Sequence, residues 1–336
     1  MKVKQITSYF EQFYPQWMAE ENDPNGLHFG SLEQDVQKVM ITLDVRPDVV
    51  AEAITKKVDL IIAKHPPLFV PAKRLTDDDP QTKMYNDLVR HNIAVYAAHT
   101  NLDIAPNGLN DWLLSDLGAE VVDYLELIHQ VPYQQFTIYD ENNDKIVKSL
   151  EKIKKVQVLA KKSHIQGIVP ATEKENVIQL LRKDFNFSND SVIWTELSEG
   201  PFAEYGIGRI GLLSQPMELE DFCQLVKKTY QMDHVKLITK DTKKQVQKVA
   251  ICSGSGQKFY PTAVRKDCDV YITGDVYYHT GHDMQETMMP VIDAGHYIEH
   301  LMKPHLLQIM QQWNQDNHWN LDIIQSEINT NPFRVY

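Results

Sequence analysis

Six short apolar runs divide the chain, and each ends at polar or glycine residues on its C-terminal side. They are KVMITLD, VDLIIAKH, IAVYAAHTNLD, KVAICSGSG, CDVYITGD and MPVIDAGH, which close at residues 44, 65, 103, 256, 275 and 296. Because the runs are continuously apolar rather than alternating, they predict strands that are covered on both faces. Ligands of such sheets gather beyond the carboxyl ends of the strands, where these polar groups lie.

The segments between several of these runs carry apolar residues at helical spacing. The predicted helices are RPDVVAEAITKK, PQTKMYNDLVRH, NGLNDWLLSDLG and LEDFCQLVKKTY, and the alternation of strand and helix predicts an α/β fold with a largely parallel sheet. The pattern breaks after about residue 128, where DENNDK, KSLEKIKK and NFSNDS are polar and poorly periodic. We therefore divide the chain into an α/β half at 1–128, an inserted α+β subdomain at 129–205 and an α/β half at 206–336.

Composition narrows the class of function. Of the 336 residues, 43% are hydrophobic and 24% are charged, as in a globular protein. A net charge of −12 argues against electrostatic binding of nucleic acid, but a small phosphorylated substrate needs only a local positive site. No run approaches the roughly 18 apolar residues of a membrane span, and the N-terminus lacks the features of a signal peptide. Three cysteines without CxxC spacing fit reduced thiols, so we expect a cytoplasmic protein.

The clearest candidate chemistry lies in DAGHYIEHLMK, residues 293–303. If a helix begins after Gly295, His296 and Glu299 share one face, and an imidazole with a carboxylate is a common pair of ligands for a divalent cation. His300 would point about 100° away from Glu299. The plainer interpretation of the same residues is a helix start with incidental polar side chains.

Two further strand ends carry candidate ligands. In AAHTNLD, Asp103 could bind or bridge a metal and His99 could bind or orient it, unless the segment is an Asx-type turn. His65 could bind through a neutral imidazole, although a histidine at a strand end is more often structural, and Lys64 has no free lone pair. Two histidines and two carboxylates at three strand ends together predict a metal site: His65, Asp103, His296 and Glu299.

Two glycine patterns and a cysteine are candidates for other kinds of site. YGIGRIGLL matches G-x-G-x-x-G, but a dinucleotide site needs a helix next, and LLSQP is strand-like and expected to stop at Pro216. ICSGSGQKF, residues 251–259, follows a strand, so its backbone amides could cradle an anion, or it is a tight strand-to-helix turn. Nothing pairs Cys252 with a base, so we expect no thiol nucleophile.

In combination and in this order, these motifs resemble one family. KHPPLF is similar to its His-His-Pro segment, and AAHTNLD, YITGDVYYH and DAGHYIEH are similar to its other signatures. WMAEENDPNGLHFG resembles its N-terminal Asp-x-x-Gly-Leu element, and GIGRIG its glycine-rich strand entry. The family is that of the GTP cyclohydrolase 1 type 2 homologs, also called dinuclear metal centre or NGG-interacting-factor-three-like proteins. The resemblance covers about residues 1–128 and 205–312.

This resemblance implies two similar α/β halves, with mixed and largely parallel sheets, packed around a two-metal site and usually assembled in a ring-shaped homohexamer. The family's ligands carry over to four residues, His65, Asp103, His296 and Glu299. The first of its paired histidines is Lys64 here, which removes one ligand of one metal. We therefore expect one or two divalent ions, Zn, Fe or Mn, in each subunit.

The leading functional hypothesis is a metal-dependent hydrolase acting on a small, nucleotide-like molecule, with GTP ring opening as one named reaction. A divalent ion would acidify a coordinated water and polarise the bond attacked. Lys64 would supply the positive charge of a second metal, and His99 would carry a proton. The alternative is a non-enzymatic, ring-forming metal-binding scaffold or adaptor that lost its chemistry with the ligand at position 64.

Overall fold

The computed structural model describes residues 1–140, 143–153, 155–161, 164–188, 191–197 and 199–335. The chain forms two compact units, Met1–Glu126 with Gly206–Tyr336 and Leu127–Tyr205. Two long strands, β5 (Ala119–Ile138) and β9 (Phe202–Glu218), run from one unit into the other. The domain boundaries at 128/129 and 205/206 stay a prediction. No described helix is long and apolar enough to cross a membrane.

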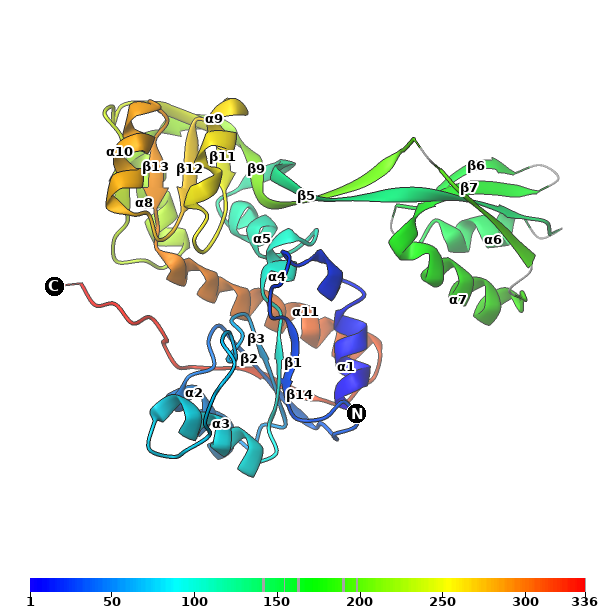
Figure 1. The fold of residues 1–336 in the computed structure, drawn as a ribbon. Helices are drawn as coiled ribbons and strands as arrows, with labels where there is room; N and C mark the ends of the chain where they lie inside the picture. Colours follow the sequence, from blue (N-terminus) through cyan, green and yellow to red (C-terminus); the bar gives the residue numbers. More distant parts are fainter. Residues whose placement is uncertain (141–142, 154, 162–163, 189–190, 198, 336) are drawn as a thin grey trace. The chain divides into compact units, whose positions relative to one another are not determined.

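The first sheet of the larger unit has five strands in the order β1, β4, β3, β2, β14. Figure 1 labels β1, β2, β3 and β14 of this sheet. Its strands are β1 (Gly26–Phe29), β2 (Lys38–Thr42), β3 (Leu60–Ala63), β4 (Ala94–Ala97) and β14 (Asp322–Gln325). β4, β3, β2 and β14 are parallel, and β1 is the antiparallel edge. The associated helices are α1 (Val3–Phe10), η1 (Gln16–Met18), α2 (Pro47–Thr55), α3 (Pro80–Arg90), α4 (Thr100–Ile104) and α5 (Leu109–Asp116).

The second sheet places β10, β13, β12, β11, β9 and β5 side by side. Its shorter strands are β10 (Lys236–Ile238), β11 (Gln245–Ile251), β12 (Val270–Thr273) and β13 (Val291–Asp293), of which the last three are parallel. Its helices are α8 (Leu219–Thr229), η4 (Gln257–Phe259), α9 (Tyr260–Arg265), α10 (Tyr278–Glu286) and η5 (His296–Leu301), whereas α11 (Met302–Asp316), which follows η5, packs against β14 and β2 of the first sheet. All six apolar runs thus form strands, and the predicted mixed, largely parallel α/β fold is confirmed.

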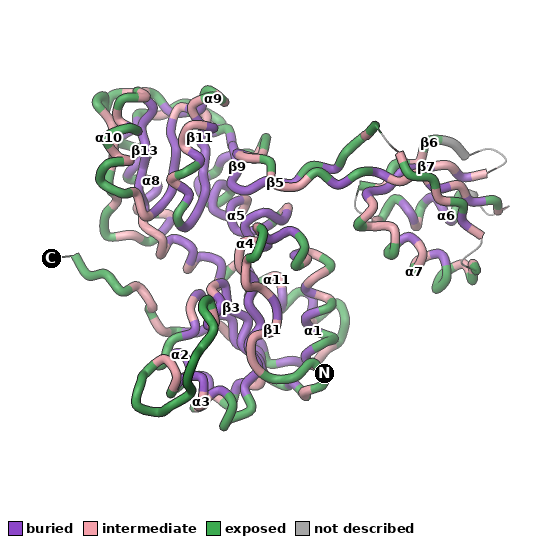
Figure 2. Tube along the Cα trace, viewed as in Figure 1, coloured by how far each residue is buried: buried purple, intermediate pink, exposed green. Residues whose placement is uncertain are grey.

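Local sequence explains why these elements form and where they begin. β3, β4 and β12 are buried at every position, as continuous apolar runs require, and the strand cores are coloured as buried in Figure 2. Helix α3 begins after Asp79, whose carboxylate accepts from the amides of Gln81 and Thr82, and Pro80 occupies the first helical position. Helix α2 likewise starts at Pro47.

The described part of the smaller unit is built from antiparallel strands, two α-helices and a short 3-10 helix. Its elements are α6 (Asn143–Leu150), β6 (Gln157–Lys161), β7 (Ile165–Pro170), η2 (Ala171–Glu173), α7 (Lys174–Phe185) and β8 (Val192–Glu196). β7 and β8 pair with the distal part of β5, and β6 pairs with β7. Helices and strands share one apolar core that includes Phe136, Ile146 and Val177. The α+β character predicted for the inserted segment is therefore present.

The structure differs from the sequence-based expectations in two places. β9 does not stop at Pro216 but continues to Glu218, because the pairing with β11 is irregular between residues 246 and 248 and a bulged ladder tolerates a missing N–H. The last strand, β14, pairs with β2 and so completes the first sheet, although it lies in the segment 206–336.

Arg209, on β9, links the second sheet to the α4–α5 segment from within the core. Only 1% of the residue is exposed, and its guanidinium forms an ion pair with Asp111 at 2.8 Å. It also donates to the carbonyls of Ile104 and Ala105 at 3.1 and 2.8 Å. A buried charge that satisfies this many acceptors cannot be removed without leaving them unpaired.

Replacing Arg209 by Met is expected to lower the free energy of unfolding by about 3 kcal/mol or more, because a carboxylate and several carbonyls lose their donor. Urea denaturation of the full chain measures this loss. The matched control is Arg90→Met, since Arg90 pairs with Asp77 at the surface and such pairs contribute about 0–1 kcal/mol. Equal losses in the two variants would contradict the assignment of Arg209 as the buried link between β9 and the α4–α5 segment.

Candidate metal centre

The candidate site lies beyond the carboxyl ends of strands from both sheets. His65 follows β3, and His296 opens η5 directly after β13. Glu299 lies one turn further along η5, where the threefold period of a 3-10 helix puts residues three apart on the same face. The short helix predicted after Gly295 therefore forms, and it directs His296 and Glu299 to one place.

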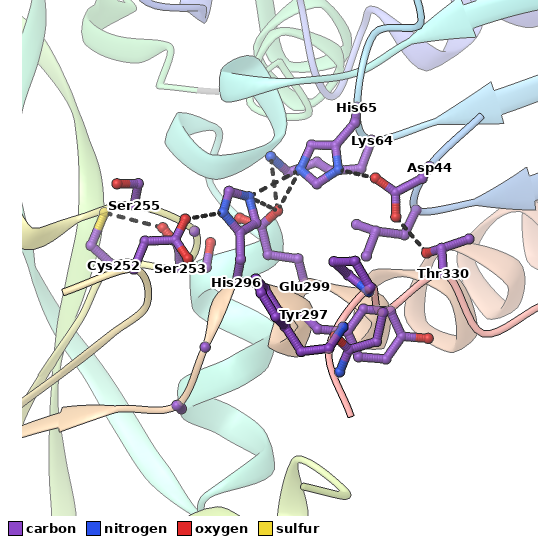
Figure 3. Close-up of a pocket in the computed structure, with 18 of the residues that line it drawn as sticks. Asp44, Lys64, His65, Cys252, Ser253, Ser255, His296, Tyr297, Glu299 and Thr330 are labelled. Carbon is purple, nitrogen blue, oxygen red and sulfur yellow. Dashed lines mark hydrogen bonds and ion pairs between the residues drawn. The ribbon is translucent and has the colours of Figure 1, made fainter. Parts of the chain in front are cut away.

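Three potential ligands converge there. The Nε2 atoms of His65 and His296 are 3.3 Å apart, and Oε2 of Glu299 lies 3.0 Å from the first and 3.5 Å from the second. Within the described residues, these side chains form a group whose ligand atoms all lie within 4.8 Å of one another. In Figure 3 the dashed lines from both imidazoles meet at the Glu299 carboxylate, so the three groups could hold one cation.

Each of these histidines is oriented by an aspartate that precedes it by 21 residues. Asp44 accepts from Nδ1 of His65 at 2.7 Å, and Asp275 accepts from Nδ1 of His296 at 2.7 Å. A carboxylate on Nδ1 fixes the ring and leaves Nε2 directed at the centre, which is the usual arrangement behind a metal-binding histidine. Sequence reasoning gave neither aspartate a role, although the repeated spacing between strand ends was a readable signal.

Lys64 occupies the side of the centre next to Asp103. Its Nζ lies 2.9 Å from Oδ2 of Asp103 and 3.7 Å from Oε2 of Glu299, with all three side chains buried. The other oxygen of Asp103, Oδ1, is buried and has no hydrogen-bond partner among the described residues. Asp103 is thus near the group but held by Lys64, and its place among the ligands stays a prediction.

His99 stands at the rim of the same site. Its ring centroid is 5.8 Å from that of His65, and its Nδ1 donates to Asp23 at 2.5 Å. Asp23 also accepts from the Thr100 hydroxyl at 2.6 Å, so the carboxylate is fixed from two sides. Asp23 opens the Asp-x-x-Gly-Leu element, which sequence reasoning recognised without assigning it a contact. His99 is therefore a positioned imidazole beside the centre, outside the three-ligand group.

The electrostatics of the cluster follow from burial and close opposite charges. Burial alone would lower the pKa of Lys64, but the carboxylates of Asp103 and Glu299 raise it to about 12. Burial likewise opposes charge on His65, but hydrogen bonds to Asp44 and Glu299 raise its pKa to about 9. For Glu299, the cationic neighbours overcome burial and lower the pKa, whereas burial raises the pKa of Asp103. Lys64 is therefore a permanent cation.

Several features fit a divalent cation at this centre. Two imidazole nitrogens and a carboxylate oxygen suit Zn, Fe or Mn, and the unpartnered Oδ1 of Asp103 is a further oxygen nearby. Gly254 leaves the space open, because a Cβ there would lie 2.8 Å from Oε1 of Glu299 and 3.4 Å from Nε2 of His296. The group lines a cavity of about 1130 Å³ that also reaches His99 and Lys64.

Fold and site together define an α/β protein with a His–Glu centre at the strand ends of two sheets. The chain belongs to the Duf34/NIF3 (NGG1p interacting factor 3) family, whose sequence model matches residues 1–332. It is 36% identical over 336 residues to a Streptococcus pneumoniae serotype 4 protein named "GTP cyclohydrolase 1 type 2 homolog", with 99% of each chain covered. A Bacillus subtilis protein of the same name is 32% identical over 365 residues, covering 98% of this chain and 97% of its own.

A solved structure supports the same relationship. The fold matches that of a Bacillus cereus protein related to NIF3 with a TM-score of 0.90 at 29% identity, covering 100% of this chain and 99% of that one. The recognition of this family from the sequence motifs is therefore confirmed.

Metal affinity is expected to rise with pH, because a cation must displace the proton that His65 carries below its pKa of about 9. For one displaced proton, the dissociation constant for Zn²⁺ should fall by about tenfold per pH unit up to about pH 9 and then level off. Titration calorimetry in buffers of different ionisation enthalpy measures the released proton. His305→Asn is the control, since His305 pairs with Asp116 away from the centre. A pH-independent affinity between pH 7 and 9 would contradict this view of His65.

Proposed function

We propose that this protein is a metal-dependent hydrolase of a small, nucleotide-like substrate. The observation that carries the proposal is the convergence of His65, His296 and Glu299 in one cavity. A divalent cation held by these ligands supplies Lewis-acid chemistry and lowers the pKa of a bound water toward about 7. The metal is Zn, Fe or Mn, and Asp103 is the proposed fourth ligand.

The chain's own residues would provide the remaining chemistry. His99 has its Nδ1 held by Asp23, which leaves Nε2 as the nitrogen that can accept or return a proton in the cavity. Lys64 acts through the carboxylates it contacts, because its fixed charge offsets Asp103 and Glu299 and keeps the centre attractive to an anion. It stands where a second metal would otherwise supply charge.

The cavity lining supports an anionic substrate with an aromatic part. Arg46 and Arg334 line it, and within the described ranges neither pairs with a carboxylate. Phe69, Tyr297 and Phe333 offer rings for stacking at the same cavity. Guanidinium groups with aromatic faces suit a phosphate joined to a base, and the relatives named GTP cyclohydrolase 1 type 2 homolog make GTP one candidate.

Assembly and location are proposed from the same family. We infer a homohexameric ring in the cytoplasm. The three cysteines are free and buried, which fits a reducing compartment.

A screen of phosphatase, nucleotidase and GTP-hydrolysing activity with Mn²⁺, Fe²⁺ and Zn²⁺ tests the enzyme directly. Activity should appear with at least one metal and fall by about 100-fold or more in Glu299→Gln, because the centre loses its buried anionic ligand. Glu286→Gln is the matched control, since Glu286 is exposed and pairs with Lys240. If no activity is measured with any of the three metals, the result would favour the alternative, a metal-binding scaffold or adaptor.

Lys64→His should raise the metal content from about one toward two ions per chain, because an imidazole can bind the second ion that the ammonium replaces. Elemental analysis after dialysis against Zn²⁺ measures the occupancy. Without metal, this variant should also unfold at a lower temperature, since Asp103 loses its buried partner. Lys240→His is the surface control, and an unchanged occupancy in Lys64→His would contradict the role given to Lys64.

A further inference from the structure

The loop that follows β11 runs directly past the metal centre. Gly254 has a φ of +64° and lies so close to Glu299 and His296 that any side chain there would collide with the Glu299 carboxylate. The backbone of residues 253–255 therefore forms one wall of the cavity beside the candidate ligands. Figure 3 shows Ser253 and Ser255 on the same side of the centre as His296.

The loop is held rigidly by hydrogen bonds at its two ends. The amide of Ser253 donates to Oδ1 of Asn110 at 2.9 Å, and the amide of Gly256 donates to the Thr273 hydroxyl at 3.0 Å. The carbonyl of Gly254 accepts from the amide of Gly274 at 2.9 Å. A tight turn would need no more than these contacts, so further polar groups in the loop are available for another purpose.

Two donors inside this fixed frame have no partner among the residues that the structure describes. One is the Ser253 hydroxyl, whose oxygen is buried, in a residue of which only 7% is exposed. The other is the amide of the buried residue Gly254. Buried donors are nearly always satisfied in folded proteins, and an unpaired one costs about 1–3 kcal/mol. Both residues line the cavity, which indicates a ligand there that accepts hydrogen bonds.

We propose that the Ser253 hydroxyl and the Gly254 amide bind an oxyanion of the substrate, a phosphate group, next to the metal centre. Hydrogen donors select an anion rather than a second cation, and the fixed charge of Lys64 on the same cavity lowers the cost of bringing it there. This inference rests on the proposed function, because it names the group by which that substrate is held. The sequence analysis considered ICSGSGQKF either as an anion-binding loop or as a tight turn. This proposal favours the anion-binding loop and names its two donors.

The test is inorganic phosphate binding to the full chain loaded with Mn²⁺. Titration calorimetry gives the affinity, and broadening of the ³¹P resonance by Mn²⁺ reports whether the phosphate lies beside the metal. Ser253→Ala should weaken phosphate binding by about tenfold or more, with unchanged Mn²⁺ affinity and unfolding temperature. Ser214→Ala is the control, because Ser214 is exposed and does not line the cavity, and it should bind phosphate like the wild type.

The outcomes separate this inference from the proposed function. Phosphate binding that is absent, or equally strong in Ser253→Ala and the wild type, would overturn the loop site even if Mn²⁺ binds tightly. Phosphate binding that depends on Ser253 in a protein that fails to bind Mn²⁺ would support the loop site and defeat the metal-dependent hydrolase.

Discussion

The larger unit depends on one buried carboxylate, that of Glu299, which must have positive groups around it. The residue is 2% exposed, and a carboxylate so far from water is tolerated only where cations or donors face it. Lys64 and His65 reach it from the first sheet, and His296 reaches it from its own helix. The two sheets therefore meet at their strand ends through charge compensation, and the same requirement creates a place where a metal ion can bind.

Each sheet directs one histidine toward the Glu299 carboxylate, and in both sheets an aspartate orients that histidine. In each, an aspartate after one strand orients a histidine after the neighbouring parallel strand, as in the pairs Asp44–His65 and Asp275–His296. The two sheets are also similar at their opposite strand ends. Asp59 accepts from the amides of residues 37 and 38 in the first sheet, and Asp269 accepts from the amides of residues 247 and 248 in the second. Two similar halves thus contribute equivalent imidazoles to one shared centre.

Much of this fold was predictable because its strands are unusually regular in composition. Runs such as LIIA before Lys64 contain no polar residue, so they predict a strand that is buried on both faces of the sheet. β14, with the sequence DIIQ, was not predicted, because four residues with polar ends carry no comparable signal. For the candidate site, the sequence alone showed the types of the ligand residues and their positions at strand ends. The contact of Lys64 with Asp103 was not, because tertiary packing alone joins residues 39 positions apart. The orienting aspartates look like ordinary turn residues until the equal spacing is compared.

The charge at the centre explains why a lysine can stand where the family resemblance implies a histidine. Asp103 and Glu299 are two buried negative groups, and Lys64 offsets one of them permanently because its pKa is about 12. One divalent cation with neutral imidazoles would then leave this inner cluster with a single positive charge. With two divalent cations and a neutral residue at position 64, the net charge of the same cluster would be two positive charges instead of one. A tethered ammonium therefore keeps the attraction for an anion without a second ion that can dissociate, at the cost of one site for Lewis-acid activation.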